Sequence, residues 1–281
     1  MKSEESISPM HKRGIFATLI VAIFITSMST TVTGNMIPNF TAYFGVSANL
    51  AQWLTSGATL VSGIIIPVTA FLIKKVPNKI YFFVAMIAYT LGSLSAFLAQ
   101  AFPILLVSRL VQAIGCGMMI PFGQVILLNL YPAERHGRVM AAFSMASMVS
   151  TVVGPTYAGL MLDSFGWRGV FVSLFVFGIA ILIFGSIFMK NVIPKTDADL
   201  NVGYVVLSAI GFACLLIGIS NISGGSLLRL QSGGLMLIGL IALVVFSRLQ
   251  LTSKKPMLNL RVFKDSSFRI AIVISICLYL I

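Results

Sequence analysis

The chain has 281 residues, of which 58% are hydrophobic and only 9% are charged, against roughly 25% charged residues in an ordinary soluble domain. This composition, with a mean hydropathy of +1.02, excludes a soluble globular protein and indicates a membrane protein. A formal net charge of +12 would suggest nucleic-acid binding in a soluble protein, so the positions of the basic residues decide its meaning.

Apolar stretches of about 20 residues, long enough to cross a bilayer as helices, follow one another along the chain. We predict membrane spans at 15–37, 51–73, 80–100, 103–128, 139–161, 168–189, 203–222 and 233–250. The first is too long for a secretory signal and has no small-residue cleavage site after it, so we expect it to be retained. The final stretch, Ile270 to Ile281, would reach only about 18 Å as a helix and cannot cross the membrane unaided.

Basic residues gather in alternate connecting segments. Sixteen of the 19 Lys and Arg residues precede the first span or lie in the loops after the second, fourth, sixth and eighth spans. The intervening loops hold only Arg168 and Arg229. By the positive-inside rule we expect the N-terminus in the cytoplasm of a multi-pass protein of the cell membrane, the bacterial plasma membrane being favoured. The positive charge is then a topology signal, and we expect no nucleic-acid partner.

Arg109 is the one charged residue that lies in a predicted span away from the ends of that span, where a cation is costly and functional by default. It shares a helix face with Gln112 at i+3, and Gly115 extends that face by a turn. We expect the guanidinium and the amide to point together into the helix bundle. The alternative is that Arg109 reaches toward the outer surface and only holds its helix to a neighbour.

The fifth predicted span carries small residues at four-residue spacing, Ser150, Gly154 and Ala158, followed by Gly159 and interrupted by Pro155. Such spacing lets two helix backbones approach closely, and proline removes a backbone donor and bends a helix. The pattern is consistent with a seam that moves, and equally with static helix packing.

Several of these segments together resemble a known family. Residues 109–115 resemble the RxxQGxG signature of major facilitator transporters, and 154–159 with 165–168 resemble their antiporter motif and its downstream FGWR. Residues 35–38 with Gln52 and Trp53, and 256–263, resemble segments of the EmrB/QacA-type fourteen-span drug:proton antiporters.

The resemblance implies an all-α membrane protein with the major facilitator fold: an N-terminal six-helix domain, two extra helices and a truncated ninth. We accordingly divide the chain into a cytoplasmic tail (1–14), the six-helix transporter domain (15–190), the two additional helices (191–250), and a cytoplasmic loop with an incomplete ninth helix (251–281). It also implies alternating access around a site between two halves, so that a missing C-terminal half is needed for full activity.

Residue roles follow from the same resemblance. Arg109 and Gln112 correspond to the proton-handling position of the fourth span, and Gly154, Pro155 and Gly159 to the antiporter motif. Two positions depart from the family. Ser29 stands where an acidic residue is frequent, and Lys74 stands where the first cytoplasmic loop usually has an aspartate, which removes a charge pair thought to latch that loop.

Proton coupling needs a group that gains and loses a proton, and arginine stays charged throughout. No predicted span contains a carboxylate; Asp163 is the acid nearest to a helix end. We therefore expect either that Asp163 carries the proton or that the carrier lies in sequence beyond this chain.

The absence of intramembrane acids favours a neutral, zwitterionic or anionic amphipathic substrate over a lipophilic cation. Candidate cavity-lining residues are Asn35, Gln124 and Trp53. Methionines such as Met145 and Met148 would add a deformable apolar lining, although ordinary packing is the commoner role of methionine.

No catalytic motif, metal-ligand cluster or nucleotide-binding loop is present in the sequence, so we expect no enzyme activity, no metal and no cofactor. The expected function is proton-coupled efflux of amphipathic small molecules or drugs across the lipid bilayer by alternating access. The alternative is a truncated, transport-inactive membrane fragment with a structural or regulatory role only.

Overall fold

The computed structural model describes residues 8–193, 202–220 and 226–252, together with the isolated residues 265, 266, 268–270, 272 and 274. The chain divides into two compact units, 1–197 and 198–281, and each is described by itself. Every regular element among the described residues is a helix, which confirms the all-α prediction for this part of the chain.

The first unit begins with α1 (Pro9–Asn35), whose N-terminus is capped by the Ser8 side chain accepting a hydrogen bond from the His11 amide. Proline at the first helical position suits such a start, so the helix begins six residues before the predicted span. Two short helices that the hydropathy did not indicate follow, α2 (Ile37–Phe44) and α3 (Ala48–Ala51). Gly45 separates them with a φ of 63°, a left-handed conformation that favours glycine.

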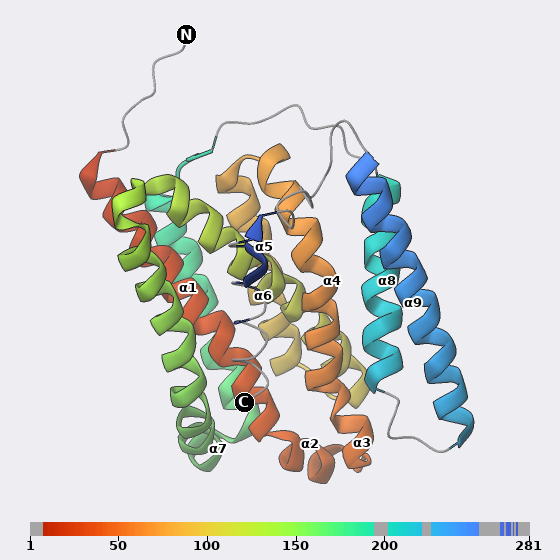
Figure 1. Cartoon of the computed structure of the whole chain (residues 1–281). Coiled ribbons are helices and arrows are strands. Elements are labelled where there is room, and N and C mark those ends of the chain that lie inside the picture. Colours follow the sequence, from red (N-terminus) through yellow and green to blue (C-terminus); the bar gives the residue numbers. More distant parts are fainter. Residues whose placement is uncertain are drawn as a thin grey trace. The chain divides into compact units, whose positions relative to one another are not determined.

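Three long helices come next, α4 (Trp53–Lys75), α5 (Asn78–Phe97) and α6 (Phe102–Leu130). A short 3₁₀ turn, η1 (Ala133–Arg135), leads into α7 (His136–Phe188). At about 1.5 Å per residue the 53 residues of α7 would be far longer than a roughly 30 Å hydrocarbon core. The helix reverses at Gly166, whose φ of 66° and ψ of −179° are not helical, and Figure 1 shows two antiparallel arms. These arms, 136–165 and 167–188, correspond to the fifth and sixth predicted spans.

Helix α6 packs against α1, α4 and α5, and the two arms of α7 cover α1 and α5. The interior between them is filled by large side chains, among them a stacked pair of Tyr81 and Phe122 with ring centroids 4.9 Å apart. The Tyr81 hydroxyl donates to Thr69 Oγ1 at 2.8 Å and so ties α5 to α4.

At one end of the first unit an aromatic cluster fastens α2 to the turn of α7. Trp167 packs against Phe40, Tyr43, Phe44 and Phe171. Arg168 donates to the Tyr43 hydroxyl and to the Ala99 carbonyl, both at 3.0 Å, and its guanidinium lies over the Tyr43 and Trp167 rings. Arg168 therefore joins the turn of α7 to α2 and to the segment between α5 and α6.

At the opposite end the start of α5 is joined to the end of α7. Asn78 Oδ1 accepts hydrogen bonds from the Val192 and Ile193 amides, and Asn191 Oδ1 accepts one from the Lys79 amide. These uncharged contacts lie beside the turn between α4 and α5, close in sequence to Lys74 at the end of α4.

The second unit contains α8 (Val202–Ser220) and α9 (Ser226–Thr252). The two helices cross closely, because a Cβ added to Gly239 would lie 2.8 Å from the Leu215 amide nitrogen and 2.9 Å from the Gly211 carbonyl oxygen. Both coincide with predicted spans. The predicted ninth helix falls mostly outside the described residues; of it only 270, 272 and 274 are described, and each is helical.

Candidate transport site

The site is built on α6, where Arg109 and Gln112 share one face and are buried, with only 2% and 0% of their surface exposed. Arg109 Nη1 donates a short hydrogen bond to Gln112 Oε1. The i, i+3 spacing thus brings the two groups together inside the bundle, as the sequence predicts. Arg109 does not reach the outer surface, as the alternative supposed, because only 2% of its surface is exposed; whether it acts in transport or only holds α6 to its neighbours stays a prediction.

Serines from two other helices complete the network. Arg109 Nη1 also donates to Ser29 Oγ of α1 at 3.2 Å, and Gln112 Nε2 donates to Ser93 Oγ of α5 at 2.7 Å. Ser93 in turn donates to the Tyr89 carbonyl within its own helix. A continuous chain of hydrogen bonds therefore connects α1, α6 and α5 at the level of Arg109.

Paired glycines allow α5 and α6 to approach closely enough for this network. A Cβ on Gly92 would lie 2.5 Å from the Gln112 amide nitrogen, and a Cβ on Gly115 would lie 2.5 Å from the Ala85 carbonyl oxygen. Because the obstructing atoms are backbone atoms, no side-chain rotation could relieve these contacts. The two backbones touch on either side of Gln112 and fix its distance from Ser93.

The positive charge of Arg109 is met by neutral oxygens. No carboxylate among residues 8–193 forms an ion pair or hydrogen bond with it; its partners are the Ser29 hydroxyl and the Gln112 amide oxygen. Arg109 Nε and the Tyr89 hydroxyl, both fully buried, have no hydrogen-bond partner among the described residues. Buried donors without partners are unfavourable, so this site retains capacity for one more acceptor.

The small-residue stripe of α7 lies against α1. Ser150, Gly154 and Ala158 are buried, and a Cβ on Gly154 would lie 2.5 Å from Thr31 Oγ1. Ser27 and Ser147 place their hydroxyl oxygens 3.4 Å apart across the same contact. Pro155 and Gly159 are on the exposed side of the arm, and space beside Gly159 is open. The family motif therefore has one member in the helix contact and two facing outward.

The remaining sequence-predicted residues lie apart from the Arg109 network. Asn35 is exposed at the end of α1, where its side-chain amide donates to the Thr31 carbonyl at 3.0 Å. Gln124 is exposed on α6, Trp53 is half-buried at the start of α4, and Asp163 is exposed near the turn of α7. Ser93 and Tyr89 were missed by the sequence reasoning, although Gly92 beside Ser93 signals a close helix approach.

The family model of the Major Facilitator Superfamily matches residues 19–277. The chain is 36% identical over 262 residues to the MFS-type transporter YcnB of Bacillus subtilis, covering 92% of this chain and 55% of that protein. It is 33% identical to the lincomycin resistance protein LmrB of B. subtilis (95% and 56%) and 27% identical to the probable multidrug resistance protein EmrY of Escherichia coli (93% and 52%). The chain thus spans about half the length of these curated relatives.

Solved structures confirm the fold. A peptide transporter, POT, superposes with a TM-score of 0.63 at 16% identity, covering 85% of this chain and 52% of that one. The proton:xylose symporter XylE gives 0.55 at 13% identity, covering 86% and 56%. Within the described residues, six helical segments are long and apolar enough to cross a membrane, one of them being the double-length α7 segment. The chain belongs to the Major Facilitator Superfamily.

Proposed function

We propose that the chain forms one half of the transport pathway of a proton-coupled exporter of amphipathic small molecules, with its N-terminus in the cytoplasm. The observation that carries the proposal is the buried Arg109 network. It links α1, α5 and α6 through a charge that has no carboxylate partner among residues 8–193. A fixed buried cation lowers the pKa of an acid brought close to it, and the bare Arg109 Nε offers a donor to such an acid or to a substrate oxygen.

The contact between α1 and the first arm of α7 supports alternating access. Gly154 permits close approach, while Met145, Met148 and Val152 on the same arm are 64%, 71% and 75% exposed. An exposed, uncharged surface beside a small-residue contact suits a cavity wall that binds apolar groups and shifts against its neighbour. Asn35 and Gln124 would add neutral hydrogen-bonding groups, and Asp163 remains the candidate proton carrier within the described residues.

Lincomycin is the first substrate to test, because relatives at 30–33% identity are named lincomycin resistance proteins. Everted vesicles would contain this chain alone or together with the remaining part of B. subtilis LmrB. With an imposed pH gradient we expect labelled lincomycin uptake only in the combined vesicles, and a protonophore should abolish it.

The role of Arg109 is tested in the combined vesicles. Arg109→Gln replaces the guanidinium with a neutral amide that can still form hydrogen bonds. Uptake should then fall at least about a hundredfold if the Arg109 charge sets the pKa of the proton-carrying group. Lys79→Gln, an exposed residue whose side chain has no part in the network, is the control. Unchanged uptake by Arg109→Gln would refute the assigned role, and no uptake in either kind of vesicle would favour the transport-inactive fragment.

A further inference from the structure

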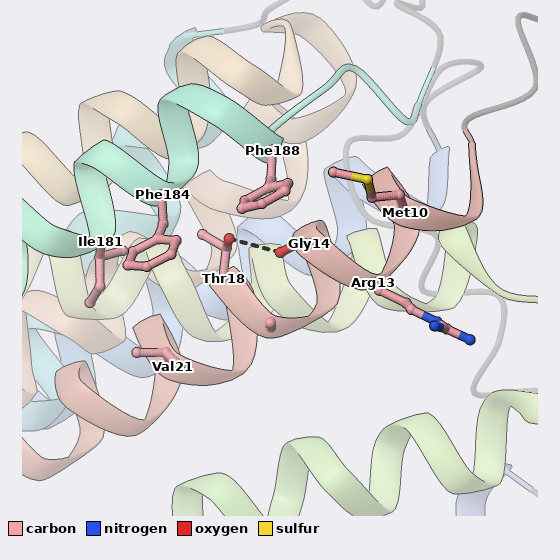
Figure 2. A pocket seen from close by; sticks show the side chains of 9 residues that line it. Met10, Arg13, Gly14, Thr18, Val21, Ile181, Phe184 and Phe188 are labelled. Carbon is pink, nitrogen blue, oxygen red and sulfur yellow. Dashed lines mark hydrogen bonds between the residues drawn. The ribbon is translucent and has the colours of Figure 1, made fainter.

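A groove in the first unit lies between the N-terminal part of α1 and the end of α7, remote from the Arg109 network. Its cavity volume is about 420 Å³, within the range of roughly 300–1,000 Å³ of small-molecule sites. Figure 2 shows its lining side chains. They are Met10, Arg13, Gly14, Ala17, Thr18, Val21, Ile181, Phe184 and Phe188.

The lining is apolar apart from Arg13. The Thr18 hydroxyl donates to the Gly14 carbonyl at 2.8 Å, so it presents no free donor to the groove. Phe188 rests directly on α1, because a Cβ on Gly14 would lie 2.2 Å from its ring. Phe184 is 56% exposed and Val21 49%, so the groove is open along its side. Such a site offers contact to a hydrocarbon and almost nothing to a polar ligand.

The length of the groove fits one leaflet. From Met10 to Val21 the helix rises about 16 Å at 1.5 Å per residue, and half of the hydrocarbon core is about 15 Å. Arg13 lies about one helical turn from the end of the groove at Met10. An extended acyl chain lying along α1 would therefore place its polar head beside Arg13.

Arg13 lies at one end of the groove, where its guanidinium extends away from the rings of Phe184 and Phe188 (Figure 2). Arg13 is exposed and makes no hydrogen bond or ion pair within residues 8–193, and Lys12 precedes it. The pKa of the Tyr131 hydroxyl is raised by partial burial, and the positive charges of Arg13 and Arg135 oppose part of that rise. Both guanidinium groups therefore lie near the Tyr131 hydroxyl. Glu134 is the only carboxylate at this end among these residues, and it forms no ion pair with Arg13.

We propose that this groove binds an anionic phospholipid, with one acyl chain between α1 and α7 and the phosphate beside Arg13. Apolar contact with the lining supplies the affinity for the chain, and Arg13, which has no ion-pair partner within residues 8–193, supplies the preference for negative charge. The groove shares no residue with the Arg109 network.

Native mass spectrometry of the purified chain in detergent tests this assignment, with dioleoyl phosphatidylglycerol and dioleoyl phosphatidylcholine as probes. We expect one tightly retained phosphatidylglycerol. Arg13→Gln should weaken its binding about fivefold, as for one basic residue near an anionic headgroup, and should leave phosphatidylcholine binding unchanged. Lys79→Gln, a cation at the same end outside the groove, is the charge control.

Ala17→Phe fills the groove and should reduce retention of both lipids at least about tenfold, whereas Ala141→Phe, at an exposed alanine outside the groove, should not. Glycerol 3-phosphate, which has the head but no chain, should not compete.

Equal phosphatidylglycerol binding in the wild type and Arg13→Gln, or full competition by glycerol 3-phosphate, would overturn the proposal. So would absence of retained lipid, which would indicate that another protein segment covers the groove. Because the Arg13 side chain is exposed and makes no hydrogen bond within residues 8–193, its variant remains informative even if Ala17→Phe does not fold.

Discussion

Ser29, Gln112 and Ser93 each form a hydrogen bond with a partner on another helix, so the loss of any one removes a bond between helices. Gln112 illustrates this, since its oxygen accepts from Arg109 and its nitrogen donates to Ser93. In an apolar interior an unsatisfied donor costs more than the bond itself contributes. The network therefore fixes the positions of these side chains as well as their chemistry.

Ser93→Ala should destabilise the protein by about 1–3 kcal/mol, because it leaves Gln112 Nε2 buried without an acceptor. Ser95→Ala is the matched control on the same helix. The Ser95 hydroxyl bonds only to the Leu91 and Gly92 carbonyls of its own helix, so its loss should change stability by less than about 0.5 kcal/mol. Unfolding of both variants in detergent would be followed by circular dichroism. Equal effects would mean that the bond between Gln112 and Ser93 contributes nothing specific.

In the contact between helices α1 and α7, only some glycines of the α7 motif lie at the interface, while another faces open space. A Cβ on Gly154 would lie 2.5 Å from Thr31 Oγ1 of α1, whereas a Cβ on Gly159 would have no neighbouring atom within 4 Å. The difference follows from helix periodicity: Gly154 and Ala158 are four residues apart on one face, and Gly159 is turned about 100° away from Ala158.

Gly154→Ala should destabilise the contact between α1 and α7 by about 1–3 kcal/mol, because the added methyl overlaps the Thr31 side chain. Gly159→Ala should instead stabilise its helix by about 0.5–1 kcal/mol, since alanine is the better helix former. Thermal unfolding in detergent distinguishes the two.

A double variant tests the physical reason for the Gly154 effect. Thr31→Ala removes the nearest atom, Thr31 Oγ1, and should recover part of the stability that Gly154→Ala loses. Additive losses in the double variant would show that the two sites do not touch.

Sequence reasoning identified the long helices and the Arg109–Gln112 pair because hydropathy and i, i+3 spacing are local properties. It missed α2, whose eight residues are too few for a hydropathy signal, and it missed Ser93, whose partner Gln112 is 19 positions away. The predicted span began at 15, whereas α1 begins at Pro9. The Ser8 cap stabilises a first helical turn that contains polar residues, and hydropathy does not detect such a turn. The functional roles predicted from the sequence all remain predictions: proton handling by Arg109, Gln112 and Asp163, the antiporter motif of Gly154, Pro155 and Gly159, and the cavity lining by Asn35, Gln124 and Trp53.

At the scale of the molecule, the two ends of the first unit are held by different chemistry. The α2 end is fastened by Arg168 and aromatic rings, and the opposite end by the amides of Asn78 and Asn191. Phe16 of α1 packs against Tyr131 after α6 with centroids 6.0 Å apart, so η1 lies at the N-terminal end of α1. The basic loops of the first unit and the N-terminal end of α1 thus lie at one end of that unit, which the positive-inside rule predicts to be the cytoplasmic end.

This arrangement makes the proposed orientation testable by labelling. Asn49, on α3, and Glu134, in η1, are both exposed and lie at opposite ends of α1, whose 27 residues extend about 40 Å. In a background with the three native cysteines replaced by alanine, Asn49→Cys should react with a membrane-impermeant maleimide in intact cells. Glu134→Cys should react only in everted vesicles, because the membrane shields the cytoplasmic end. A permeant maleimide labelling both variants equally is the control for reactivity, and the reverse pattern would place the N-terminus outside.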